Sequence, residues 1–248
     1  MNSEFFQLAP LQIAVAILAI VLAYTIKGLS GFGAGLIAIP LLSLVLPITI
    51  VVPAVSLLSY GGNLIQSFSL RRQASWRDLW PLMPFSALGV ILAVWLLVNI
   101  DPRQLALAMG LFVIAYALYS LLPLQGLAGS RLWAIPFGSL GGFIGALFGS
   151  SGFIYVVYLK LRPLDKAGFR ASVAMGLALD GTFRISGYIT SGLFNTRVLT
   201  LVAILFPVLL LSMKAGNYLH LNISPARFNQ IVSVLLMVSG VMLVYKSI

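Results

Sequence analysis

The sequence predicts an all-α integral membrane protein, folded as a polytopic bundle of helices. Hydrophobic residues make up 60% of its 248 positions and charged residues only 8%, whereas a soluble domain carries roughly 25% charged residues. Apolar runs recur from one end to the other, and no polar block is long enough for a soluble domain. The alternating pattern of a transmembrane β-strand is absent from the sequence. We therefore expect a single transmembrane domain over residues 1–248.

The apolar runs fall into two sets of five. We expect helices at about 11–27, 34–46, 49–70, 79–98 and 104–122, and then at 132–148, 152–160, 168–190, 197–219 and 227–246. A helix rises 1.5 Å per residue, so about 20 residues are needed to span roughly 30 Å of hydrocarbon. Six runs are long enough to cross, and the first two runs of each set are shorter.

Two glycine-rich breaks separate the short runs. The first, Lys27–Pro40, reads K-G-L-S-G-F-G-A-G-L-I-A-I-P, and the second, Gly145–Gly152, reads G-A-L-F-G-S-S-G. Unpaired backbone groups in hydrocarbon cost several kcal/mol each, so irregular chain at this depth must line a cavity or be buried in protein. Breaks at corresponding places in two halves of a chain are typical of a transporter's substrate site.

Each short pair is either one broken crossing or a hairpin that enters and returns. With hairpins, one side of the membrane collects Arg71, Arg72, Arg77, Arg131, Lys160, Arg162, Lys166, Arg170 and Arg227, and the other only Arg103, Arg197 and Lys246. Single crossings remove this bias, so the positive-inside rule favours hairpins.

The hairpin topology places the N-terminus outside and makes the cytoplasmic loops about 71–78, 123–131, 161–167 and 220–226. The second half, about 132–246, then runs through the membrane upside down relative to the first, about 10–122. We therefore predict two inverted repeats, each with a glycine-broken helical hairpin.

A helix begins after each break, near Gly35 and near Gly152. Helix N-termini present unpaired N–H groups and about half a positive charge, which suits an anion. The predicted substrate-binding residues are Lys27, Ser30, Gly31, Gly33, Gly35, Asn63, Gly149, Ser150, Ser151, Gly152 and Arg184. The alternative is that the glycines only allow close helix packing, because several lie four residues apart.

Four ionisable residues, Lys27, Asp180, Arg184 and Lys214, lie within apolar segments, where charges indicate function by default. Asp180 and Arg184 are four apart on one predicted helix and are expected to form a charge pair. The sequence leaves open whether Arg184 also faces the pocket, and whether Lys27 serves the first break or extends to the membrane interface. For Lys214 we expect that the side chain extends to the membrane interface.

Other functions are weakly supported. The chain has no cysteine and a single histidine, His220, so we expect no metal site and no cofactor. The net charge of +10 follows from the basic loops and does not indicate nucleic-acid binding. Gly149-Ser150-Ser151-Gly152 fits the G-x-S-G pattern of rhomboid proteases, but His220 lacks the glycine context expected of the base.

Taken together, these motifs resemble those of the sulfite exporter TauE/SafE family, also called the toluene sulfonate uptake permease family. The resemblance covers the whole chain and is strongest in G-L-S-G-F-G-A-G-L-I-A-I-P at 28–40, F-G-S-S-G-F-I-Y-V-V-Y-L-K-L-R at 148–162 and L-D-K-A-G-F-R-A-S at 164–172. It implies a multi-pass secondary transporter of the bacterial inner membrane that exports small sulfur-containing anions, such as sulfite, sulfonates or sulfoacetate. The expected partners are this anion and the lipid bilayer. An anion channel is the main alternative, and the rhomboid-like protease the weaker one.

Overall fold

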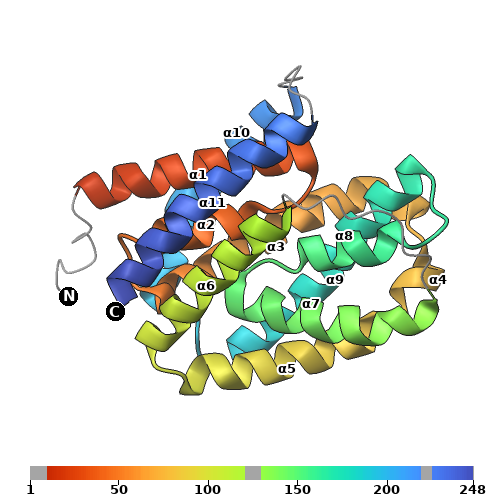
Figure 1. Cartoon of the computed structure of the whole chain (residues 1–248), viewed down its shortest axis with the longest axis horizontal. Helices are drawn as coiled ribbons and strands as arrows, with labels where there is room; N and C mark the ends of the chain where they lie inside the picture. Colours follow the sequence, from red (N-terminus) through yellow and green to blue (C-terminus); the bar gives the residue numbers. More distant parts are fainter. Residues whose placement is uncertain (1–9, 121–129, 219–224, 248) are drawn as a thin grey trace.

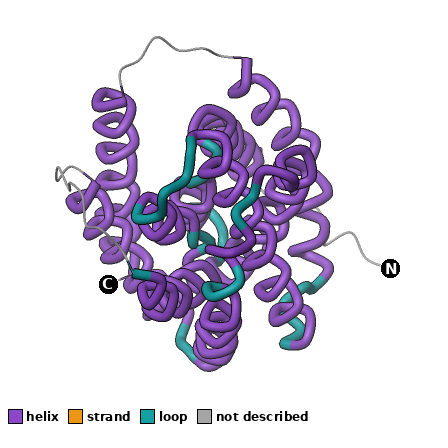
Figure 2. Tube along the Cα trace, turned by 90° about the vertical axis from the view of Figure 1, so that its right-hand side faces the viewer, coloured by secondary structure: helices purple, strands orange, loops and turns teal. Residues whose placement is uncertain are grey.

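The computed structural model describes residues 10–120, 130–218 and 225–247. Within these ranges all regular secondary structure is helical, as the sequence predicts (Figures 1 and 2). The helices are α1 Pro10–Ser30, α2 Ala34–Ser43, α3 Ile48–Leu70, α4 Trp76–Leu79, α5 Met83–Asn99, α6 Pro102–Ser120, α7 Ala134–Phe148, α8 Gly152–Lys160, α9 Lys166–Thr190, α10 Thr196–Tyr218 and α11 Pro225–Ser247.

Short polar residues and prolines set the helix starts. The Asp165 carboxylate accepts a 2.9 Å hydrogen bond from the N–H of Gly168, which caps α9. Asn195 does the same for α10 through the N–H of Val198, at 3.0 Å. Pro102 is the first residue of α6, where its missing N–H has no helical partner to lose. These local signals determine where the long helices α6, α9 and α10 begin.

Five helical stretches are long and apolar enough to cross a membrane: Gln12–Leu29, Ile48–Gln73, Pro102–Ser120, Arg131–Phe148 and Thr196–Tyr218. This set differs from the six expected, because it includes the first arm of each hairpin and omits α5, α9 and α11. The apolar helical stretches of α5 and α11 are shorter, at Met83–Asn99 and Val232–Ser247. Helix α9 has 25 residues but carries polar and charged side chains that are buried among other helices. A helix enclosed by protein does not need the apolar surface that faces lipid.

Both short pairs are hairpins rather than single broken crossings. At the first hairpin, Nε2 of Gln12 near the start of α1 donates to the carbonyl of Val45, just past the end of α2, at 3.2 Å. At the second, Arg131 precedes α7 and Arg162 follows α8, yet both approach the Asp78 carboxylate, at 3.8 and 2.9 Å. The two arms of each pair therefore begin and end on the same side of the bundle.

The second hairpin opens at the end of the bundle where the basic residues gather. The backbone N–H of Ser75 there donates a 2.8 Å hydrogen bond to Oγ of Ser172, near the start of α9. At the opposite end, Nζ of Lys246 donates to the carbonyls of Ser43 and Leu44 at the end of α2, at 3.1 and 3.0 Å. The two hairpins thus enter the bundle from opposite ends.

Glycines allow close packing between the halves of the chain. Helix α1 packs on α10, where a Cβ at Gly28 would lie 2.7 Å from the carbonyl oxygen of Met213. Helix α7 packs on α5, where a Cβ at Gly138 would lie 2.6 Å from the carbonyl oxygen of Leu82. Figure 1 shows α1 and α10 on one side and α5 and α7 on the other. In each pair the first helix of one half contacts the fourth main helix of the other. An inverted repeat would explain this reciprocal packing of first and fourth helices, but the repeat itself stays a prediction.

Candidate functional site

The two breaks meet inside the bundle. Gly31, Gly33 and Gly149 have φ of +86°, +90° and +66°, a region that residues with a Cβ rarely adopt. The backbone of Gly35 lies directly against the carbonyl of Gly149, with no room for a side chain between them. A Cβ at Gly152 would lie 3.1 Å from that of Phe32. These glycines therefore do more than end helices, because they let the two hairpin tips touch.

A cavity of about 30 Å³ lies between the breaks, which is close to the volume that one water molecule occupies in the liquid. Most of the predicted substrate-binding residues line it: Lys27, Gly33, Gly35, Asn63, Gly149, Ser150, Ser151, Gly152 and Arg184. Gly31 shapes the first break but is not part of the lining. The side chain of Ser30 lies outside the described part of the chain.

Two helix N-termini reach this cavity. Gly33 is the N-cap of α2 and Ser151 is the N-cap of α8, and both residues line the cavity. The first N–H groups of a helix have no partner within the helix and carry partial positive charge. The lining is therefore rich in donors on both sides.

Lys27 is buried beside the cavity, with 3% of its surface exposed, and does not extend to the membrane interface. Its ammonium donates to Oδ1 of Asn63 at 2.6 Å and to the carbonyl of Ser59 at 3.2 Å. No carboxylate pairs with it among the residues that the structure describes. Lys214, in contrast, is exposed on the surface of α10.

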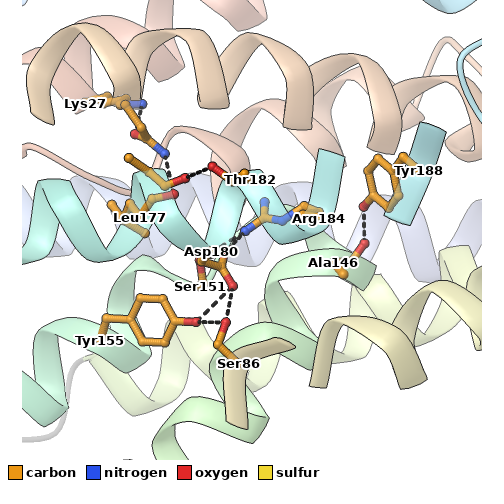
Figure 3. A network of polar contacts seen from close by, with 12 residues as sticks. Lys27, Ser86, Ala146, Ser151, Tyr155, Leu177, Asp180, Thr182, Arg184 and Tyr188 are labelled. Atoms are coloured by element: carbon orange, nitrogen blue, oxygen red, sulfur yellow. Dashed lines mark hydrogen bonds and ion pairs between the residues drawn. The ribbon is translucent and has the colours of Figure 1, made fainter. Parts of the chain in front are cut away.

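Asp180 and Arg184 form the charge pair expected from their spacing, at the centre of the polar network in Figure 3. Oδ1 of Asp180 accepts hydrogen bonds from the hydroxyls of Ser86 and Tyr155 at 2.8 and 2.9 Å. Oδ2 accepts from Ser151 Oγ at 2.7 Å and from Nη2 of Arg184. Donors from α5, α8 and α9 itself thus satisfy a carboxylate that is fully buried. Arg184 also lines the cavity, which answers the question that the sequence left open.

Sequence reasoning missed several residues of the site. The cavity lining also contains Phe32, Ala34, Ser59 and Leu177, and the Asp180 network contains Ser86 and Tyr155. Ser59 lies one helical turn before Asn63, so the polar face of α3 gave a signal for it. Ser86 lies 94 residues from Asp180 along the chain, and no spacing rule connects the two.

The protease alternative rested on a serine and a distant histidine. His220 lies outside the described residues. The Ser151 hydroxyl is hydrogen-bonded to Asp180 and to Arg184. No group of three or more metal-ligating side chains occurs in residues 10–120, 130–218 and 225–247.

Comparison with known proteins gives a family and one relative. The family model for the sulfite exporter TauE/SafE matches residues 16–243. The chain is 28% identical over 177 residues to the "Probable inner membrane transporter protein TsaS" of Comamonas testosteroni, which covers 69% of this chain and 73% of that protein. No solved structure matches the chain.

Proposed function

The chain belongs to the sulfite exporter TauE/SafE family, and from this premise we propose that it is a secondary transporter that exports small sulfur-containing anions. Sulfite, sulfonates and sulfoacetate are the expected substrates. The relative's description as an inner membrane transporter supports the inner membrane as the site of action. The basic end of the bundle then faces the cytoplasm, as the positive-inside rule requires.

The observation that carries this proposal is the buried ammonium of Lys27 beside two helix N-termini. The charged groups that line the cavity or pair with its lining are Lys27, Arg184 and Asp180, which leave one net positive charge. An uncompensated buried charge carries a penalty on the order of several kcal/mol. A bound anion would offset it, and the N-termini of α2 and α8 would add to the attraction.

Transport requires the cavity to change size. A space of about 30 Å³ holds about one water molecule, so a sulfur oxyanion with its oxygens needs the walls to move apart. The two hairpins enter from opposite ends of the bundle and touch at their tips. Movement of one hairpin at a time would open the cavity to one side and then to the other, which is alternating access.

The driving force favours export. A membrane potential that is negative inside favours anion efflux by about 2.3 kcal/mol per charge per 100 mV. Export then needs no coupling ion, whereas import would need one.

The proposal is tested with purified protein in proteoliposomes. We expect saturable, counterflow-stimulated uptake of labelled sulfite or a sulfonate, with little uptake of matched carboxylates. Ohmic flux without counterflow would identify an anion channel instead. Protein that is folded by its melting curve yet moves none of these anions would overturn the proposal.

A further inference from the structure

The two adjacent serines of the second break have different hydrogen bonding. Ser151 Oγ donates to Oδ2 of Asp180 at 2.7 Å and accepts from Nη2 of Arg184 at 3.1 Å. Its single proton is therefore already in use. Ser150 Oγ is buried, with 4% of the residue exposed, and has no hydrogen-bond partner among the described residues. Nothing in the sequence distinguishes these two hydroxyls.

A second donor at the same cavity is also without a partner. Arg184 is 5% exposed and its Nη2 is engaged with Asp180, but its Nε has no partner in the described part of the chain. Both Ser150 and Arg184 line the cavity. A buried donor left unsatisfied costs about 1–3 kcal/mol, and native proteins leave few of them without a reason.

The two free donors lie beside the start of α8. The N–H groups of Ile154 and Tyr155 are bonded to the carbonyl of Ser151, at 3.1 and 3.2 Å. The N–H groups that precede them, beginning at Gly152, have no carbonyl one turn earlier within α8. Hydroxyl, guanidinium and backbone donors thus lie together at the start of α8, whereas two of the three N–H groups of the Lys27 ammonium are already bonded, to Asn63 and to the carbonyl of Ser59.

We propose that an oxyanion group of the substrate binds on the α8 side of the cavity and accepts hydrogen bonds from Ser150 Oγ and Arg184 Nε. Ser151 is then a positioning residue, which acts by holding Asp180 and the Arg184 guanidinium in place. This inference rests on the proposed anion transport and divides the predicted site into donors that touch the anion and groups that orient them.

The test compares Ser150→Ala with Ser151→Ala, the same substitution at neighbouring positions. Each purified protein is titrated with sulfite and with sulfoacetate, and the ligand-dependent rise in melting temperature gives the Kd. For Ser150→Ala we expect a Kd at least about tenfold higher, because a hydrogen bond to a charged group is lost. Its melting temperature without ligand should not fall, since the lost hydroxyl had no partner.

Ser151→Ala should show the opposite pattern. Its melting temperature without ligand falls, because buried Asp180 loses a donor, and its Kd changes less than that of Ser150→Ala. Arg184→Lys provides a second test of the anion contact, because lysine keeps the charge opposite Asp180 but has no group equivalent to Nε. We expect its Kd to rise as well.

The outcomes separate this inference from the function on which it rests. If the wild-type protein binds sulfite and sulfoacetate but Ser150→Ala binds them equally well, the assignment of the anion contact is overturned and the transport proposal stands. If the folded wild-type protein binds neither anion, both are overturned.

Discussion

The ammonium of Lys27 donates a 2.6 Å hydrogen bond to Oδ1 of Asn63, which lies 36 residues further along the chain on α3. The carboxamide fixes the position of the ammonium but cannot neutralise its charge. Within the described residues no carboxylate does so either. The bond therefore holds the Lys27 ammonium beside the cavity, where, on the proposed function, the substrate anion would pair with it.

Replacing Lys27 with methionine should abolish sulfite binding without unfolding the protein. The substitution removes the net positive charge of the site, and it also removes the penalty for burying an unpaired charge. We expect no sulfite-dependent rise in melting temperature, while the melting temperature without ligand stays the same or increases. Lys214→Met is the matched control, because Lys214 is exposed and is not part of the cavity lining. Wild-type sulfite affinity in Lys27→Met would contradict this role.

Asp180→Asn should destabilise the protein strongly. The change leaves the Arg184 guanidinium buried without its counter-charge, a situation that typically costs about 3–5 kcal/mol. Denaturant unfolding in detergent, followed by tryptophan fluorescence, measures the change in free energy of unfolding. A loss below about 1 kcal/mol would show that the pair contributes little.

The double variant Asp180→Asn with Arg184→Gln separates stability from transport. Removing both charges leaves no unpaired ion, so part of the lost stability should return. Transport in proteoliposomes should remain absent, because Arg184 is a proposed anion contact. A double variant as unstable as Asp180→Asn alone would mean that the carboxylate acts mainly through Ser86, Tyr155 and Ser151.

Gly33→Ala and Gly192→Ala form a matched pair of backbone substitutions. The two glycines have φ of +90° and +68°, and a Cβ at either would meet nothing within 4 Å. Each alanine should therefore lower the free energy of unfolding by about 1–2 kcal/mol through backbone strain alone. Only Gly33→Ala should also weaken sulfite binding, since Gly33 is the N-cap of α2 and Gly192 lies beyond the end of α9. Equal effects on binding would argue against a role for the first break.

Single cysteines can test which end of the bundle faces the cytoplasm, because the chain has no cysteine of its own. Arg77 and Arg197 are exposed residues at opposite ends of the bundle. In intact cells with the outer membrane permeabilised, an impermeant maleimide should label Arg197→Cys and spare Arg77→Cys. Inside-out vesicles should give the reverse. The opposite labelling would show that the basic end of the bundle faces the outside, which would contradict the proposed orientation in the membrane.

The sequence predicted those parts of the site that depend on local backbone chemistry. Glycines such as Gly33 and Gly149 favour helix ends whatever surrounds them in the fold. The four-residue spacing of Asp180 and Arg184 likewise allows them to pair on any helix. The different bonding of Ser150 and Ser151 could not be predicted, because it depends on where α9 places Asp180. Long-range packing likewise decides that Lys27 is buried against α3 rather than extended to the interface.

The small size of the cavity also bears on how the membrane stays sealed. Two hairpins that enter the bundle from opposite ends and touch at their tips would let protons leak down their gradient if a continuous file of water joined them. A space of about 30 Å³ holds a single molecule rather than a file. Proton hopping needs consecutive waters, so a cavity of this size would limit proton leakage while the transporter has no substrate bound.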